Sequence, residues 1–154
     1  MKSGLIAFFL LLLATPMAWA EKVRIACIGD SITFGAGIAN RETDSYPAQL
    51  QKQLGDGYDV RNFGNSGRGV LRASWRAADN TKRAYIFQQE HLEALAFQPH
   101  IVICNLGIND VDDYRNGHAA EFVGDYLALL ADYQKLPTQP KLFLWTRLAP
   151  LAPG

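Results

Sequence analysis

The stretch Gly-Asp-Ser-Ile-Thr-Phe-Gly at residues 29–35 follows directly on Val-Arg-Ile-Ala-Cys-Ile at residues 23–28. The earlier six residues form a short apolar run rich in β-branched side chains, which predicts a strand buried on both faces of a sheet. Ser31 then stands at the carboxyl end of that strand, where open α/β sheets bind their ligands. An ordinary turn would use the same residue types, with glycine for backbone freedom and Asp30 and Ser31 for turn hydrogen bonds. The stretch alone leaves both interpretations open.

The rest of the chain alternates strands and helices. Further strands are predicted at residues 58–63, 100–106 and 141–146, the first of them less apolar and nearer a sheet edge. Helices are predicted from Ser45 as N-cap to a stop at Gly55, over residues 83–97, and over residues 118–135. The core positions expected in the middle helix are Phe87, Leu92, Leu95 and Ala96. This alternation predicts an α/β protein with a flavodoxin-like, three-layer, doubly wound parallel sheet and right-handed crossovers.

Composition indicates one globular domain in 154 residues, of which 49% are hydrophobic. Fifteen basic and fifteen acidic residues give no net charge, so neither a nucleic-acid surface nor a polybasic membrane patch is expected. Residues 1–20 have a positive start at Lys2, an apolar core over residues 5–14 and small residues before Glu21. This pattern predicts a secretory signal peptide cleaved after Ala20, hence a secreted or periplasmic protein without stable membrane insertion. The domain is then residues 21–154.

Cys27 and Cys104 both lie in apolar, strand-like runs. Two buried free thiols are favoured over a disulfide, because neighbouring strands rarely offer the Cβ geometry that a disulfide needs. No zinc signature surrounds either cysteine, and neither a metal nor a cofactor is expected. Asp110, Asp112 and Asp113 are interpreted as a solvated acidic loop, since their spacing matches no calcium loop.

Three polar motifs each follow a predicted strand. They are Gly-Asp-Ser at residues 29–31, Gly-Asn-Ser-Gly at residues 64–67 and Gly-Ile-Asn-Asp at residues 107–110. Because parallel strands end at one edge of the sheet, these motifs are expected to lie within reach of one another. Acyl transfer needs a nucleophile and donors aimed at the developing oxyanion. Ser31 can be that nucleophile, and the donors can be the backbone N–H groups of Ser31 and Gly67 with the side-chain amide of Asn109.

Gly-Asp-Ser-Ile, Asn-Phe-Gly-Asn-Ser-Gly and Gly-Ile-Asn-Asp, in this order, resemble the first three sequence blocks of the SGNH, or GDSL-type, hydrolases. The resemblance covers residues 22 to about 150 and implies the SGNH hydrolase fold. It also implies that Ser31 is the nucleophile, that Gly67 and Asn109 complete the oxyanion hole with Ser31, and that Asp30 supports the turn. The helix start Ser-Tyr-Pro-Ala-Gln-Leu and the turn Asn-Phe-Gly are similar to bacterial carbohydrate acetylesterases, the sialate O-acetylesterase-like group.

A fourth block of the family, Asp-x-x-His, supplies the general base and the acid that orients it. Residues 1–154 contain no such block. His91 falls within a predicted helix, His100 at the opposite end of its strand, and His118 at a helix start, so none is expected to replace the base. We therefore expect the fold to be C-terminally incomplete in these residues and the chain alone to be inactive, because a serine hydrolase without its base loses about 10⁶ in turnover.

The leading hypothesis is a serine esterase that cleaves a small-molecule or glycan ester through an acyl-enzyme, with O-acetylated carbohydrate as the favoured substrate. A lysophospholipase or short-acyl lipase is the alternative within the same class. A non-catalytic module that binds acylated glycans is kept because the Asp-x-x-His block is absent. A nucleotide or flavin binder is the weakest hypothesis, because residues 64–69 lack the proper dinucleotide pattern.

Overall fold

The computed structural model describes residues 21–73 and 83–145. The predicted signal peptide at residues 1–20 lies outside the described residues. In the described part, four strands form one parallel sheet in the order β2-β1-β3-β4. The strands are β1 (Val23–Gly29), β2 (Tyr58–Gly64), β3 (Ile101–Asn105) and β4 (Lys141–Leu144). The prediction of a doubly wound α/β sheet with β2 nearer an edge is confirmed.

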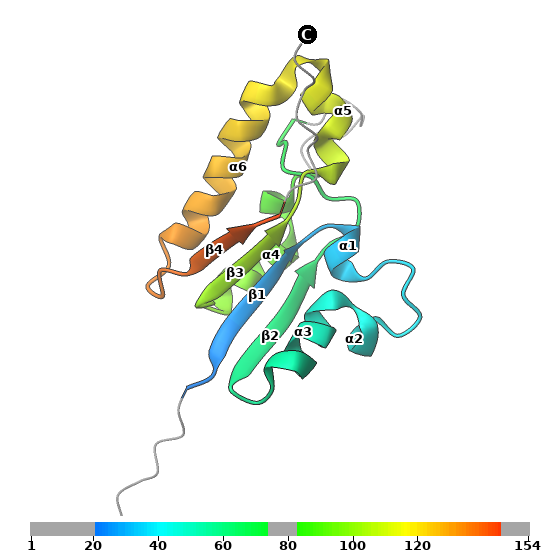
Figure 1. Cartoon of the computed structure of the whole chain (residues 1–154). Coiled ribbons are helices and arrows are strands. Elements are labelled where there is room, and N and C mark those ends of the chain that lie inside the picture. Colours follow the sequence, from blue (N-terminus) through cyan, green and yellow to red (C-terminus); the bar gives the residue numbers. More distant parts are fainter. Residues whose placement is uncertain (1–20, 74–82, 146–154) are drawn as a thin grey trace, which may run out of the picture.

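Helices cover both faces of the sheet (Figure 1). One face packs against α4 (Gln89–Ala96) and the long α6 (Ala119–Gln134), and the other carries α3 (Tyr46–Leu54). The short helices are α1 (Ser31–Phe34), α2 (Arg41–Asp44), η2 (Tyr85–Phe87), η3 (Ile108–Asp110), α5 (Val111–Asp113) and η4 (Tyr114–His118). Residues 30–44, between β1 and α3, thus contain two of these short helices, α1 and α2. No helix in the described ranges is long and apolar enough to cross a bilayer.

The core lies between the sheet and the α4–α6 layer. Alternate residues of β1 and β3 point into it, and α6 contributes a stripe at helical spacing. Its most buried members are Ala26, Ile28, Val102, Cys104, Leu129 and Tyr133. The opposite face is less completely covered, and Phe143 of β4, which pairs with Ile103, is 56% exposed there.

The middle helix differs from its prediction. Residues 83–97 hold the 3₁₀ turn η2 and then α4, with Gln88 in extended conformation between them. This break shifts the helical phase, so His91 and Ala94 are buried while Phe87 is 55% and Leu92 57% exposed. Ala96 is exposed as well, so the expected core positions Phe87, Leu92 and Ala96 are wrong. Leu95 packs against the core and is partly buried.

Both cysteines are free and buried, as expected. They point to opposite faces of the sheet, because Cys27 contacts Tyr46 of α3 and the Cys104 sulfur lies 3.2 Å from the Tyr126 hydroxyl of α6. Burial raises the pKa of each thiol to about 12.

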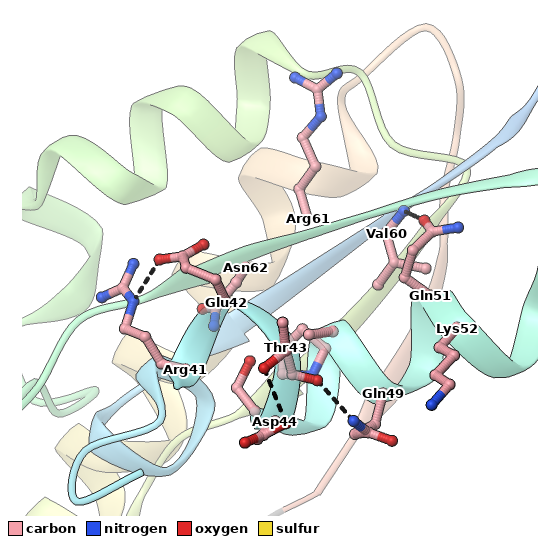
Figure 2. Close-up of a pocket in the computed structure, with 13 residues that line it drawn as sticks. Arg41, Glu42, Thr43, Asp44, Gln49, Gln51, Lys52, Val60, Arg61 and Asn62 are labelled. Carbon is pink, nitrogen blue, oxygen red and sulfur yellow. Dashed lines mark hydrogen bonds and ion pairs between the residues drawn. The ribbon is translucent and has the colours of Figure 1, made fainter. Parts of the chain in front are cut away.

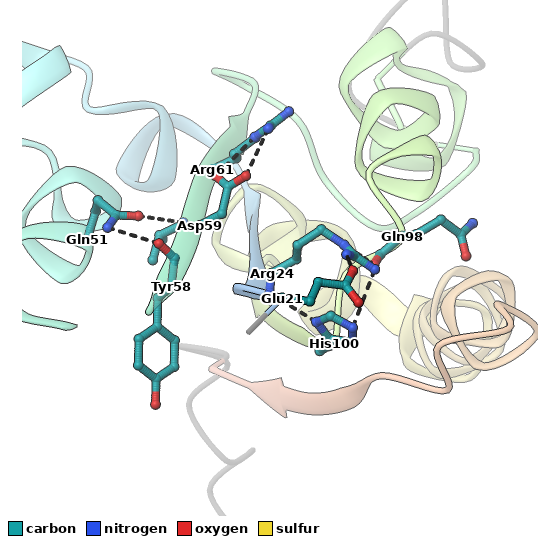
Figure 3. Close-up of polar contacts among 9 residues, drawn as sticks. Glu21, Arg24, Gln51, Tyr58, Asp59, Arg61, Gln98 and His100 are labelled. Carbon is teal, nitrogen blue, oxygen red and sulfur yellow. Dashed lines mark hydrogen bonds and ion pairs between the residues drawn. The ribbon is translucent and has the colours of Figure 1, made fainter. Parts of the chain in front are cut away.

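Gln51 closes part of the outer edge of β2 (Figure 3). Its side-chain amide accepts a hydrogen bond from Val60 N at 2.7 Å and donates one to Tyr58 O at 3.2 Å. A single glutamine side chain thus occupies backbone groups that an edge strand would otherwise leave open.

Candidate active site

Ser31 is the first residue of α1 and follows β1 after only Asp30. Asp30 is fully buried, and its Oδ1 accepts a hydrogen bond from Ile32 N at 2.9 Å. Ser31 itself is half-buried. In the described residues, its side chain makes no hydrogen bond to any histidine. The strand end thus holds a partly open hydroxyl on a turn that a buried carboxylate supports.

Two glycines allow α1 to lie against the strand ends. A Cβ at Gly29 would lie 2.1 Å from Thr33 Oγ1, and one at Gly64 would lie 2.2 Å from Phe34 N. Asn62 then fixes the end of α1, because its amide donates to Thr33 O at 2.7 Å. The position of Ser31 is set by these close contacts between α1, β1 and β2.

The second loop begins at Asn65, whose amide continues the sheet ladder to Gly29 O at 2.9 Å. The Asn65 side chain donates to Glu90 Oε2 at 2.7 Å and accepts from Arg68 Nε at 3.0 Å. Gly67 between them has φ of +76°, which only glycine adopts without strain, and a Cβ there would meet nothing within 4 Å. Within the described residues, the backbone amides of Ser31 and Gly67 donate no hydrogen bond. Both N–H groups can therefore donate to an acceptor that is not among these residues.

The third loop is tied to the second by side chains of η3. Asn109 Nδ2 donates to Arg68 O at 2.8 Å. A primary amide carries two N–H groups, so this bond orients the amide and leaves a second donor. The structure thus places Asn109 against the residue that follows Gly67.

Asp110 is 2% exposed, not solvated as the sequence suggested, and Asp113 is also buried. The Asp110 carboxylate accepts from Val70 N at 2.9 Å and Leu71 N at 3.0 Å. Burial raises the pKa of Asp110, and these two N–H groups partly offset that effect. Sequence reasoning missed this role, although an acid directly after Asn109 in the third motif was a signal that could have found it.

The three histidines lie elsewhere. His91 is 2% exposed between α4 and α6, with Nδ1 3.1 Å from Tyr133 Oη and Nε2 3.4 Å from Asp132 Oδ2. Burial lowers the pKa of His91. His100 lies at the start of β3, where its Nδ1 accepts from Arg24 N at 3.0 Å (Figure 3). His118 precedes α6, with Nδ1 3.7 Å from Glu121 Oε1.

A polar groove of about 640 Å³ runs outside the candidate site, between α2, α3 and the outer edge of β2 (Figure 2). Charged and amide side chains line it, among them Arg41, Glu42, Lys52 and Arg61. Ser31, Gly67 and Asn109 are not among its lining residues. The groove therefore does not surround Ser31.

Similarity to known proteins agrees with this arrangement. The profile of the GDSL-like lipase/acylhydrolase family matches residues 27–154. The chain belongs to this family. It is also 41% identical over 110 residues to an acetylxylan esterase of Xylanibacter ruminicola. The matched region covers 71% of this chain and 22% of that protein.

Solved structures show the same fold. The SGNH-hydrolase family esterase AlinE4 is 27% identical with a TM-score of 0.58, over 82% of this chain and 60% of the other. A carbohydrate acetylesterase family member from Sinorhizobium meliloti is 20% identical with a TM-score of 0.54, over 80% of this chain and 62% of the other. The chain thus spans under two thirds of these structures and about a fifth of the acetylxylan esterase.

Proposed function

We propose that the natural protein, meaning the polypeptide as its source makes it, is a serine esterase that removes O-acetyl groups from carbohydrate. The observation that supports this most strongly is the meeting of three loops at one sheet edge. These loops carry a half-buried serine, two backbone amides that donate no hydrogen bond within the described residues, and one side-chain amide that Arg68 O orients. Such preorganised donors are what an acyl-transfer transition state requires.

The reaction proceeds through an acyl-enzyme. Ser31 Oγ attacks the ester carbonyl, and the oxyanion accepts hydrogen bonds from Ser31 N, Gly67 N and Asn109 Nδ2. The attack forms a tetrahedral intermediate, and its collapse breaks the bond to the sugar oxygen. The sugar leaves as an alcohol with the proton that the base took from serine. Water then attacks the acetyl group, releases acetate and restores the serine hydroxyl.

The base is a histidine of the Asp-x-x-His type that the family resemblance implies. The three histidines of residues 1–154 do not contact Ser31 in the described structure, and two of them are engaged far from it in the fold. We therefore expect residues 1–154 alone to be essentially inactive. Asp30 supports the turn beneath Ser31 and is not the catalytic acid.

Acetylated plant polysaccharide is the first substrate to test, because the similar protein of Xylanibacter ruminicola is an acetylxylan esterase by name. Such a polymer lies outside the cell, which agrees with a signal peptide at residues 1–20 and a secreted or periplasmic enzyme. Amino-terminal sequencing of the natural protein should begin at Glu21. A first residue within 1–20 would contradict the cleavage site.

Acetate release from acetylated xylan tests the function directly. The natural protein should release acetate, and Ser31→Ala should release none above background while keeping its thermal unfolding midpoint. Faster hydrolysis of a lysophospholipid than of acetylated xylan would favour the lipase alternative. Binding of acetylated xylan without acetate release would favour the non-catalytic module.

A further inference from the structure

Asp110 is a buried residue of the third loop, and its carboxylate contacts the backbone of the second loop. It follows Asn109 in η3, yet both side-chain hydrogen bonds that it makes within the described residues go to backbone amides some forty residues earlier in the chain, Val70 N and Leu71 N. Two charge-assisted bonds to adjacent amides fix both the position and the direction of that backbone. The carboxylate therefore acts as a clamp between the second and third loops.

The Asp110 carboxylate also lies very close to the backbone at Gly69. A Cβ at Gly69 would lie 2.3 Å from Asp110 Oδ1, so only glycine lets the chain pass this close to the carboxylate. At the preceding residue, Arg68 O accepts a hydrogen bond from Asn109 Nδ2 at 2.8 Å. Neighbouring residues 109 and 110 thus bind the backbone at residues 68, 70 and 71, and Gly67 stands directly before this segment.

We propose that Asp110 is a positioning residue for the oxyanion hole, which places the Gly67 amide and the Asn109 side chain relative to each other. This inference rests on the proposed function. Asp110 does not touch the reacting atoms. It acts through the 68–71 backbone, so that the two donors from different loops keep the separation that one oxygen can bridge.

A carboxylate suits this position better than an amide would. It offers an acceptor oxygen to each of the two N–H groups, whereas an asparagine offers one oxygen and turns its own N–H₂ toward the other donor. Asp110→Asn therefore keeps the volume of the side chain but breaks one of the two bonds. The change should displace the loop without opening a cavity.

Asp125 provides a matched control on the same segment. Its Oδ2 accepts from Arg72 N at 2.8 Å, the amide directly after Leu71, but it comes from α6 and its side chain is 21% exposed. Asp125→Asn weakens the same kind of bond one residue further from Gly67. It should leave the oxyanion donors where they are.

The experiment compares both variants in the natural protein with an acetylated substrate at a temperature at which all are folded. Asp110→Asn should lower kcat by about 100-fold, the order expected when one oxyanion donor is lost. KM should change less than about threefold, because the donors act on the transition state and not on the bound ester. Asp125→Asn should keep kcat within about twofold of the unaltered protein.

Hydrogen exchange supplies a second, activity-independent readout. In Asp110→Asn, the amides of residues 67–71 should exchange at least tenfold faster, while those of β1 should not change. Unchanged kcat in an active, folded Asp110→Asn protein would overturn the inference and leave the proposed function intact. If the unaltered natural protein hydrolyses no ester, the proposed function fails and this inference about catalysis fails with it.

Discussion

Gly64→Ala should displace Ser31, the proposed nucleophile, without altering any residue proposed to touch substrate. Gly64 ends β2, and a Cβ there would lie 2.2 Å from Phe34 N, 2.6 Å from Thr33 C and 2.8 Å from Phe34 Cα. All three are backbone atoms, so no side-chain rotation can relieve the overlap. Ordinary contact begins at 3.4 Å, so α1 must move by about 1 Å away from β2.

This displacement should lower both the free energy of unfolding and the turnover. Overpacking of a filled site costs about 1–3 kcal/mol, and the upper end applies here because the backbone cannot yield locally. The unfolding midpoint should fall by about 5–10 °C, taking a few degrees per kcal/mol for a domain of this size. A shift of about 1 Å at Ser31 should lower kcat by about 100-fold.

The assay combines thermal unfolding with ester hydrolysis by the natural protein. Gly124→Ala is the control, since Gly124 lies in α6 with nothing within 4 Å of its Cβ. That variant should gain up to about 1 kcal/mol, because alanine favours a helix interior over glycine. A Gly64→Ala protein with unchanged unfolding midpoint and unchanged kcat would refute the contact between β2 and α1 as the determinant of Ser31's position.

Two further predictions concern buried titratable groups. Because burial lowers the pKa of His91, the unfolded chain binds a proton that the folded chain does not. Stability should therefore be full above the ordinary histidine pKa of about 6.5 and fall below it, by at most about 1.4 kcal/mol per pH unit. Urea unfolding at pH 7.5 and 5.5 measures this, and an equally steep loss in His91→Gln would contradict it. Cys27 and Cys104, whose pKa values burial raises to about 12, should react with a thiol reagent only after denaturation. Rapid labelling of the native protein would show that one of them is accessible.

Much of the fold was predictable because its signals are local. Apolar runs predicted the strands, and their alternation with helices predicted a parallel sheet whose ends share one edge. The helix at residues 83–97 was harder, because the break at Gln88 depends on tertiary contacts of Tyr85, whose hydroxyl donates to Phe63 O at 2.6 Å. A change of phase at such a break moves each later residue to a different face.

In the candidate site, too, local motifs were predictable and contacts between distant residues were not. Motifs at strand ends pointed to Ser31, Gly67 and Asn109, and the structure brings their loops together through Asn65 and Asn109. The burial of Asp110 could not be predicted from neighbouring residues, because three nearby aspartates suggest a solvated loop. Its hydrogen-bond donors are the backbone amides of residues 70 and 71, about forty residues earlier in the chain. No local sequence pattern predicts a contact over such a separation.

The central claim is that Ser31 is the nucleophile of an esterase, and one measurement tests it most directly. The natural protein and its Ser31→Ala variant would be treated with a fluorophosphonate probe, and the intact mass of each would be measured. The account predicts a single adduct on the unaltered protein, located on the peptide that contains Ser31, and no adduct on the variant. An unaltered, folded protein that takes up no probe, or an adduct that persists in Ser31→Ala, would contradict it.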